Sequence, residues 1–305
     1  MMRHALLLSV CFAAVACAAP SSGENVEESE DGLRTSYGEL FDTLEGTDLD
    51  RWFEVRSNLK KGFDNICGDT ICGGDFSNLT TVKLTCSSTR AQKKMKDCLW
   101  VLAGNIDYVD GRTGKLTTEA RTFQCHVPVN SSAKKFLDAL HGAGDRALNT
   151  TVPGTSGTFY DALVTCFDGV MGGPPPNQTA SFYVELAEQD ESFWAKRREL
   201  NDAFDQECGD TFCEGEYSDI SALRLSCAVN QNTKRVSRCG WSFAGANTNV
   251  DARGQLSADT FSKRCDFAVG ATATQFATTL SSNDPLHAPL PGKTTSIHDA
   301  LIGCL

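Results

Sequence analysis

The sequence predicts an α+β protein made of two tandem, disulfide-stapled repeats, each with a helix, a three-stranded antiparallel sheet and two further helices. Three observations predict this fold. A cysteine-rich segment occurs twice, as FDNICGDTICGGDFSNLTTVKLTC from Phe63 to Cys86 and as FDQECGDTFCEGEYSDISALRLSC from Phe204 to Cys227. Six cysteines recur in both copies. Apolar side chains follow a helical spacing before each segment and a period of two after it.

The first helix of each copy is predicted from an apolar stripe. Copy one has apolar residues three or four positions apart from Trp52 to Ile66, the spacing of one helix face. Copy two repeats the stripe with Phe193 or Trp194, then Leu200 and Phe204.

Three strands are expected next. In the first, apolar Val82, Leu84 and Cys86 alternate with polar residues. The second covers Cys98 to Tyr108, and the third covers about Thr117 to Val127. A glycine-rich turn at 110–114 connects the last two, which indicates a hairpin.

The two remaining helices are placed by capping and breaking residues. Pro128 is expected to end the third strand, and a serine at 131 or 132 is expected to cap a helix that runs to about Leu148. A short last helix then carries Cys166 in copy one and Cys304 in copy two.

The cysteines predict disulfide bonds. Twelve cysteines remain after the two in the signal region, they are spaced alike in both copies, and the chain begins with an export signal. A structural zinc site is disfavoured because four residues lie between Cys67 and Cys72, instead of the two of a CxxC pair, and no matching histidine is present. The expected pairs are Cys67–Cys72, Cys86–Cys98, Cys125–Cys166, Cys208–Cys213, Cys227–Cys239 and Cys265–Cys304.

The N-terminal segment has the pattern of a signal peptide. An apolar run precedes Ala14-Val15-Ala16-Cys17, which resembles the lipobox of bacterial lipoproteins, although those prefer leucine where Ala14 stands. The resemblance implies a lipid on Cys17 and a location in the outer membrane or at the cell surface. An ordinary signal peptide, cut after Ala16 or Ala18, would leave the protein periplasmic or secreted.

The chain divides into five parts in this interpretation. They are a signal peptide at 1–16, an acidic tether at 17–34, repeat one at 35–168, a Gly/Pro linker at 169–178 and repeat two at 179–305. The proline run in the linker is semi-rigid, which favours modules that are spaced as well as joined. The net charge of −11 argues against a nucleic-acid partner.

Two polar clusters are candidate sites. Acidic residues in the CGDTxC loops, with Asp69, Asp75, Asp210 and Glu216 as weak candidates, have the oxygen ligands that calcium prefers. Their spacing does not match an EF-hand, so turn-capping is favoured, and no metal or cofactor is expected. The second cluster is a basic hairpin tip in each copy, formed by Lys93, Lys94, Lys96, Lys234, Arg235 and Arg238, which is the best candidate for a partner contact.

No catalytic residues are predicted, because no Ser/His/Asp or Cys/His arrangement occurs in both copies. Trp100 and Trp241 occupy equivalent strand positions and are interpreted as core residues rather than a ligand platform. The CGDTxCxG(D/E)(F/Y)S motif resembles uncharacterised cysteine-rich exported proteins of myxobacterium-like bacteria, which implies an envelope location. The leading hypothesis is a non-catalytic, lipid-anchored envelope protein with two binding or structural modules and an unknown envelope or extracellular partner. Its rivals are an exported hydrolase with a carboxylate or calcium site and a two-headed protease inhibitor.

Overall fold

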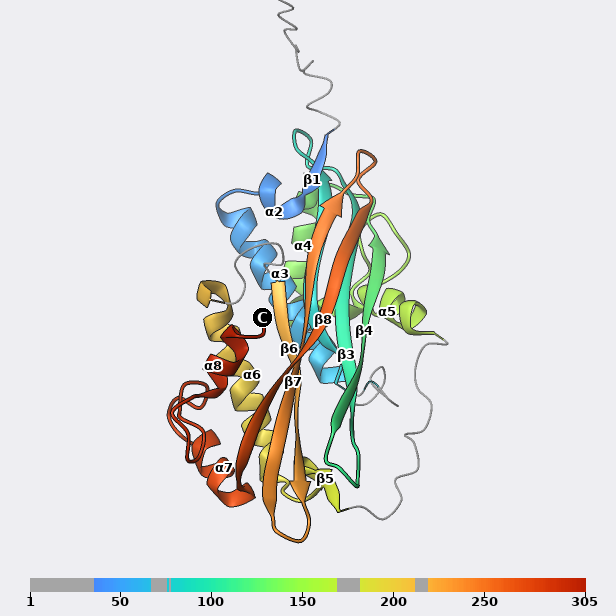
Figure 1. Ribbon diagram of the computed structural model, residues 1–305. Helices are drawn as coiled ribbons and strands as arrows, with labels where there is room; N and C mark the ends of the chain where they lie inside the picture. Colours follow the sequence, from blue (N-terminus) through green and yellow to red (C-terminus); the bar gives the residue numbers. More distant parts are fainter. Residues whose placement is uncertain (1–35, 67–75, 77, 169–181, 212–218) are drawn as a thin grey trace, which may run out of the picture.

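The computed structural model describes residues 36–66, 76, 78–168, 182–211 and 219–305. The protein is α+β and contains two four-stranded antiparallel sheets, in the orders β1-β2-β3-β4 and β5-β6-β7-β8 (Figure 1). Elements of the two halves follow one another in nearly the same order along the chain.

The first half begins with a short strand and helices that precede the main hairpins. Its elements are β1 (Tyr37–Glu39), α2 (Leu40–Thr43), α3 (Thr47–Ile66), β2 (Thr80–Thr89), β3 (Met95–Val109), β4 (Leu116–Pro128), α4 (Ala133–Ala143), the 3₁₀ helix η2 (Gly144–Asn149) and α5 (Phe159–Phe167). The strand that was expected to end at Pro128 does so, and Ser132 caps α4 by accepting a hydrogen bond from the backbone N–H of Lys135. The helix ends at Ala143, earlier than expected, because Gly144 adopts a positive φ of 54°.

The second half repeats this order, except that the 3₁₀ helix η3 stands in the place of α2 and no helix corresponds to η2. Its elements are β5 (Tyr183–Glu185), the 3₁₀ helix η3 (Leu186–Glu188), α6 (Ser192–Thr211), β6 (Asp219–Asn230), β7 (Arg235–Val250), β8 (Leu256–Thr272), α7 (Ala273–Leu280) and α8 (Ile297–Ile302).

The expectation of three-stranded sheets was wrong by one strand in each half. β1 pairs antiparallel with the end of β2, from Tyr37 opposite Thr89 to Glu39 opposite Ser87, and β5 pairs with β6 in the same way. Each added strand has only three residues. A segment this short shows too few alternations to be recognised by a period of two.

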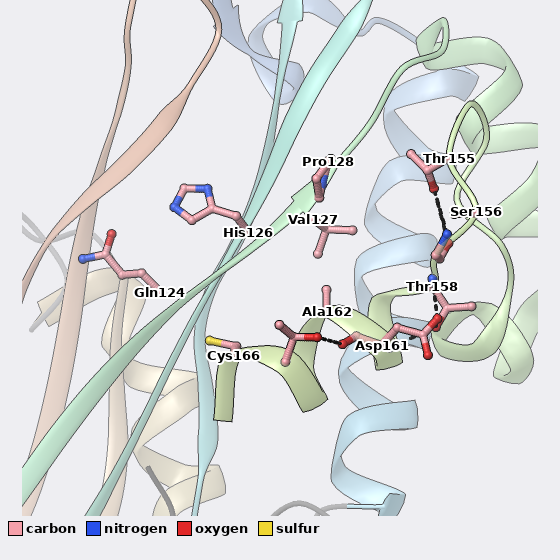
Figure 2. Close-up of a pocket in the computed structure, with 12 residues that line it drawn as sticks. Gln124, His126, Val127, Pro128, Thr155, Ser156, Thr158, Asp161, Ala162 and Cys166 are labelled. Atoms are coloured by element: carbon pink, nitrogen blue, oxygen red, sulfur yellow. Dashed lines mark hydrogen bonds between the residues drawn. The ribbon is translucent and has the colours of Figure 1, made fainter. Parts of the chain in front are cut away.

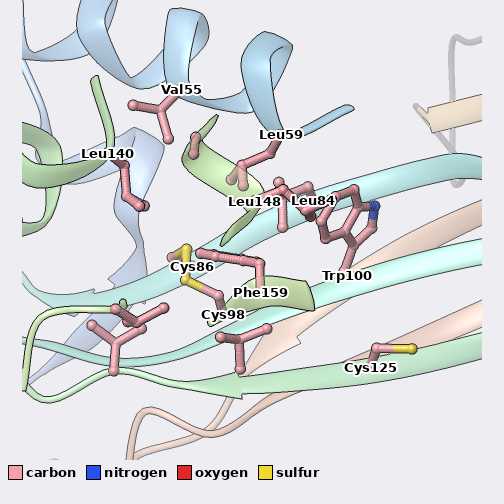
Figure 3. Close-up of a cluster of buried hydrophobic side chains, with 14 of the residues drawn as sticks. Val55, Leu59, Leu84, Cys86, Cys98, Trp100, Cys125, Leu140, Leu148 and Phe159 are labelled. Atoms are coloured by element: carbon pink, nitrogen blue, oxygen red, sulfur yellow. A yellow bond between two sulfur atoms is a disulfide. The ribbon is translucent and has the colours of Figure 1, made fainter. Parts of the chain in front are cut away.

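Each half has its own hydrophobic core between its helices and one face of its sheet. Figure 3 shows the core of the first half. The predicted stripe of α3 is the buried face of that helix, with Trp52, Val55, Leu59 and Phe63 at 0–1% exposure. In α6, Phe193 is the residue that continues the stripe, whereas Trp194 is 50% exposed. The sequence pattern therefore identified the helix faces that hold each core together.

The other faces of the two sheets pack against each other. A third apolar cluster joins both halves and consists of Val82, Leu99, Val101, Ala103, Leu223, Ala244, Ala246 and Leu256. Hydrogen bonds also cross the interface, including Thr122 Oγ1 to Thr260 Oγ1 at 2.9 Å and Ser221 Oγ to the Thr81 carbonyl at 3.2 Å. The linker was expected to space the modules apart, and this was wrong, because their sheets are in contact. The two sheets form a sandwich, and the helices lie on its outer sides (Figure 1).

The packing of the two halves is reciprocal, as in a two-fold interface. A Cβ added to Gly254, in the β7–β8 turn, would lie 2.5 Å from the ring of Tyr37 in β1. A Cβ added to Gly114, in the β3–β4 turn, would lie 2.7 Å from the ring of Tyr183 in β5. Both glycines also have positive φ, 79° and 68°. Each half thus receives the other's hairpin turn under the aromatic ring of its first strand, and the two first strands lie at opposite ends of the sandwich (Figure 1).

Candidate functional site

Several predicted residues lie outside the part of the chain that the structure describes. These are Cys17, Cys67, Cys72 and Cys213, and the acidic candidates Asp69, Asp75 and Glu216. The loop 68–71 also lies there; it is the short segment between Cys67 and Cys72 that would serve as the exposed loop of a protease inhibitor. Asp210 and Cys208 fall in the last turn of α6, where side chains are not described. The calcium, hydrolase and inhibitor hypotheses therefore remain predictions.

Four disulfides connect the described cysteines. They are Cys86–Cys98, Cys125–Cys166, Cys227–Cys239 and Cys265–Cys304, which are the pairs expected for these eight residues. In each half, one bond joins adjacent strands. The other ties β4 to α5 in the first half; in the second it ties β8 to Cys304, which lies two residues after the end of α8 rather than in that helix as expected. Bonds of this kind form in an oxidising, non-cytoplasmic compartment.

Trp100 and Trp241 are core residues, as expected. Both are 0% exposed, and each packs against the phenylalanine of its long helix, Phe63 at 5.7 Å and Phe204 at 5.8 Å between ring centroids. The indole N–H of Trp100 donates to Thr81 Oγ1 at 3.0 Å. They stabilise the fold and form no exposed platform.

The two basic hairpin tips share an unusual backbone conformation. Lys93 and Lys234 have φ values of 50° and 54°, and they are the non-glycine residues with positive φ in the described chain. The N–H of Lys93 donates to the Thr89 carbonyl at 2.9 Å, and its own carbonyl accepts from the N–H of Ala133, the first residue of α4, at 2.8 Å. Both tips therefore hold a lysine in the left-handed region, where a side chain is disfavoured.

Copy two reproduces these contacts. The N–H of Lys234 donates to the Asn230 carbonyl at 2.8 Å, and its carbonyl accepts from the N–H of Ala273, the first residue of α7, at 2.9 Å. Lys94 and Arg235 follow at equivalent, exposed positions. The third residues of the sequence-based set, Lys96 and Arg238, are not equivalent: Lys96 corresponds to Ser237.

The tips lie far apart. The β2–β3 tip is at the end of the sandwich that holds β1, and the β6–β7 tip is at the end that holds β5 (Figure 1). β3 alone has 15 residues, so the two tips are on the order of 50 Å apart at about 3.3 Å per residue. They cannot form one continuous patch, and a partner would meet each tip separately.

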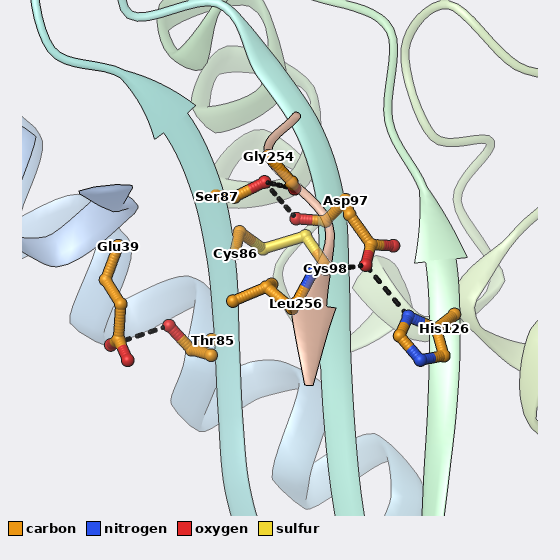
Figure 4. The surroundings of a disulfide bond; sticks show 9 residues. All are labelled: Glu39, Thr85, Cys86, Ser87, Asp97, Cys98, His126, Gly254 and Leu256. Carbon is orange, nitrogen blue, oxygen red and sulfur yellow. Dashed lines mark hydrogen bonds and ion pairs between the residues drawn. A yellow bond between two sulfur atoms is a disulfide. The ribbon is translucent and has the colours of Figure 1, made fainter. Parts of the chain in front are cut away.

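A buried carboxylate connects the first half's disulfide region to the second half (Figure 4). Asp97 is 3% exposed, and its Oδ2 accepts from His126 Nδ1 at 2.8 Å and from Gln255 Nε2 at 2.6 Å. The hydrogen bond to Asp97 raises the pKa of His126; burial opposes this, and the charge of Asp97 adds to it. The nearby Ser87 hydroxyl donates to the carbonyl of Gly254. These contacts cross the interface between the sheets.

An open depression of about 500 Å³ lies beside the edge strand β4 (Figure 2). It is lined by residues of β4, of α5 and of the loop between η2 and α5, including His126, Pro128, Thr155 and Asp161. In the second half, the position of Thr155 holds Lys293, whose ammonium donates to the carbonyl of Ala268, the counterpart of Pro128. The equivalent place is therefore bridged by a lysine, and the depression belongs to the first half.

A cluster that sequence reasoning missed lies in the second half. Glu207 Oε1 is 3.1 Å from His287 Nε2 and 3.7 Å from His298 Nε2. The centroids of the two imidazole rings are 4.3 Å apart. His287 Nδ1 is 3.1 Å from Asp284 Oδ1. That hydrogen bond raises the pKa of His287; burial opposes it, and the charges of Glu207, Asp284 and Asp299 add to it.

The cluster was missed because the copies were compared for arrangements that occur in both, and no residue of a single copy was recognised as a site. Its signal is visible in the repeat alignment: Glu207 and His298 occupy the positions of Ile66 and Tyr160. At these two positions, which converge in the fold, the second half has a carboxylate and an imidazole where the first half has residues that pack against its core.

Comparison of the chain with protein-family models, with curated proteins and with solved structures found no match in any of the three. Among the described helices, none combines the length and the apolar character that crossing a membrane requires.

Proposed function

We propose that the chain is a non-catalytic, exported protein of the cell envelope, made of two copies of one module, anchored through a lipid on Cys17, and that its two basic hairpin tips bind a polyanionic partner. The observation that carries the binding role is the left-handed lysine in both tips. Glycine would adopt this conformation with less strain, and strained residues held by their surroundings are concentrated at functional sites.

The surroundings of both lysines support this role. Two backbone hydrogen bonds fix the conformation of each residue, one within the hairpin and one to the first residue of the next helix. The backbone of each tip is therefore held in place at the lysine of positive φ. A rigid contact loses less conformational entropy on binding than a flexible one.

The charge distribution supports an anionic partner. The whole chain carries −11, yet both tips retain a pair of basic residues at equivalent positions. Two basic ends about 50 Å apart suit a long or repetitive polyanion, because bound ends raise one another's effective concentration.

Binding to immobilised dextran sulfate, at several salt concentrations, tests this role. One double variant combines Lys93→Glu with Lys94→Glu, and the other combines Lys234→Glu with Arg235→Glu. We expect each of them to bind dextran sulfate more weakly and with a smaller dependence on salt. The variant that carries all four substitutions should not bind. The matched control is Lys134→Glu with Lys135→Glu, on the exposed side of α4. Each double tip variant changes the charge as much as the control does, so equal binding by both double tip variants and the control would refute the role of the tips.

The lipid anchor is tested independently. Mass spectrometry of the mature N-terminus should show a lipid-modified Cys17, and Cys17→Ser should move the protein from the membrane fraction to the soluble fraction. An unmodified mature chain would refute the anchor and leave the hairpin proposal intact.

A further inference from the structure

Three side chains from separate segments converge in the second half. Glu207 comes from α6, His298 from α8 and His287 from the segment between α7 and α8. One ligand atom from each lies within 4.8 Å of the other two. The side chains are partly exposed, at 25%, 14% and 43% in that order, so an ion from solvent can reach them.

The separations suit a small transition-metal ion. Bonds of about 2.0–2.1 Å in tetrahedral geometry place neighbouring ligand atoms about 3.3 Å apart. The distances from Glu207 Oε1 to the histidine nitrogens are 3.1 and 3.7 Å, on either side of this value, and all three ligand atoms lie within 4.8 Å of one another. Two imidazoles and one carboxylate are also a known ligand set of zinc, one that leaves a fourth position open.

Asp284 has the role of a supporting carboxylate. Its Oδ1 lies 3.1 Å from His287 Nδ1 and also accepts the backbone N–H of His287 at 3.2 Å. When Nδ1–H donates to Asp284, the Nε2 lone pair points toward the carboxylate of Glu207. Two acceptors then face each other at 3.1 Å, and either a second ring proton or a metal ion has to lie between them. Metal-bound histidines usually make this kind of outer hydrogen bond.

The equivalent positions of the first half hold residues that could not form this cluster. The counterparts of Glu207 and His298 are Ile66 and Tyr160, which pack against the hydrophobic core. The counterpart of His287 is Asn149. The fold therefore does not need a carboxylate and two imidazoles at these positions.

We propose that Glu207, His287 and His298 bind one zinc-class divalent ion, with Asp284 orienting His287. Imidazole nitrogen favours zinc, nickel and copper over calcium and magnesium, whose preferred ligands are oxygens. The Cys265–Cys304 bond ties the segment just after α8, the helix that carries His298, to β8. This site is separate from the basic hairpins.

The test uses the full chain without a histidine tag, stripped of metal with a chelator. Co²⁺ is titrated while the visible absorption is recorded, and Zn²⁺ and Ca²⁺ are titrated in a calorimeter. We expect one Co²⁺ or Zn²⁺ ion per chain and no heat from Ca²⁺. His298→Tyr and His287→Asn, which install the residues of the first half, should each weaken binding at least about 10-fold.

His141→Asn is the matched control, because His141 lies 2.7 Å from Glu54 in the first half without a second histidine in the pair. This variant should bind the metal like the wild type. If the wild type binds no Co²⁺ or Zn²⁺, or if the His298→Tyr and His287→Asn variants bind as tightly as His141→Asn, the three residues form a protonated ion-pair cluster and the metal site is refuted. Circular dichroism confirms that each variant is folded, and His287→Asn changes the most exposed of the three ligands.

Discussion

The two buried tryptophans differ in one hydrogen bond, and this difference predicts opposite effects of exchanging a single residue between the halves. The N–H of Trp100 donates to Thr81 Oγ1 at 3.0 Å. The position equivalent to Thr81 holds Ala222, and the indole N–H of Trp241 has no partner among the described residues. Both indole rings are 0% exposed, so water cannot replace the missing acceptor.

The expected magnitudes follow from the burial. Thr81→Val keeps the side chain's shape and removes the acceptor, which should lower the free energy of unfolding by about 1–3 kcal/mol because a buried donor loses its partner. Ala222→Thr should raise it by about 1 kcal/mol by supplying the missing acceptor to Trp241. Ala222→Val is the control, since it adds similar volume without an acceptor.

Urea unfolding followed by far-UV circular dichroism, with the disulfides intact, measures these changes. In thermal unfolding, the melting temperature should shift by about 2–4 °C for each kcal/mol of changed stability, as is usual for proteins of a few hundred residues. If Thr81→Val is as stable as the wild type, or if Ala222→Thr is no more stable than Ala222→Val, the hydrogen bond does not make the contribution argued here.

Three further predictions concern the hairpins, the interface and the disulfides. Lys93→Gly should raise the free energy of unfolding by about 0.5–1 kcal/mol in a urea titration, because glycine adopts the left-handed conformation without strain; a loss of stability would contradict this. The pKa of His126 is raised in the fold, so its protonated form stabilises the folded state. This stabilisation is complete below the unfolded pKa of about 6.5 and is lost as the pH rises through the folded pKa. The stability advantage of the wild type over Asp97→Asn should therefore shrink above that pH in parallel urea series, and a constant difference would exclude the linkage. The Cys125–Cys166 bond closes a loop of 41 residues and the Cys86–Cys98 bond a loop of 12 residues. Loss of the first should therefore cost about 4 kcal/mol in chain entropy and loss of the second about 3 kcal/mol. We expect Cys166→Ala to melt at a lower temperature than Cys86→Ala.

The sequence was sufficient to predict the long elements because their periodicity is strong. The helix stripe that starts at Trp52 is several repeats of its period long. The alternation of Val82, Leu84 and Cys86 is shorter and was wrong at its first residue, because a register shift between Thr81 and Lys83 places Val82 in the cluster between the sheets, away from Leu84 and Cys86. The capping serine of α4 and the terminating Pro128 were found from local chemistry alone. These features depend on neighbours in the chain, which the sequence displays directly.

The contact between the two sheets was not predicted, although a signal for it exists. From Cys98 to Ala103 every residue of β3 is buried, so this strand is apolar on both faces. A continuous apolar run indicates a strand covered on both sides. Only the face of Trp100 was assigned to a core, and the residues between, such as Leu99 and Val101, cover the second sheet.

The comparison of the two copies separates what the fold requires from what each half has acquired. Both copies keep the cysteine pairs, the buried tryptophan and the lysine of positive φ, so these features belong to the shared module. The histidine cluster replaces packing residues in the second half alone, and the open depression beside β4 occurs in the first half, where no lysine bridges it. A requirement that a site appear in both copies detects only the shared role. For a duplicated chain, positions at which one copy exchanges a core residue for a titratable one are therefore the better guide to chemistry that only one half performs.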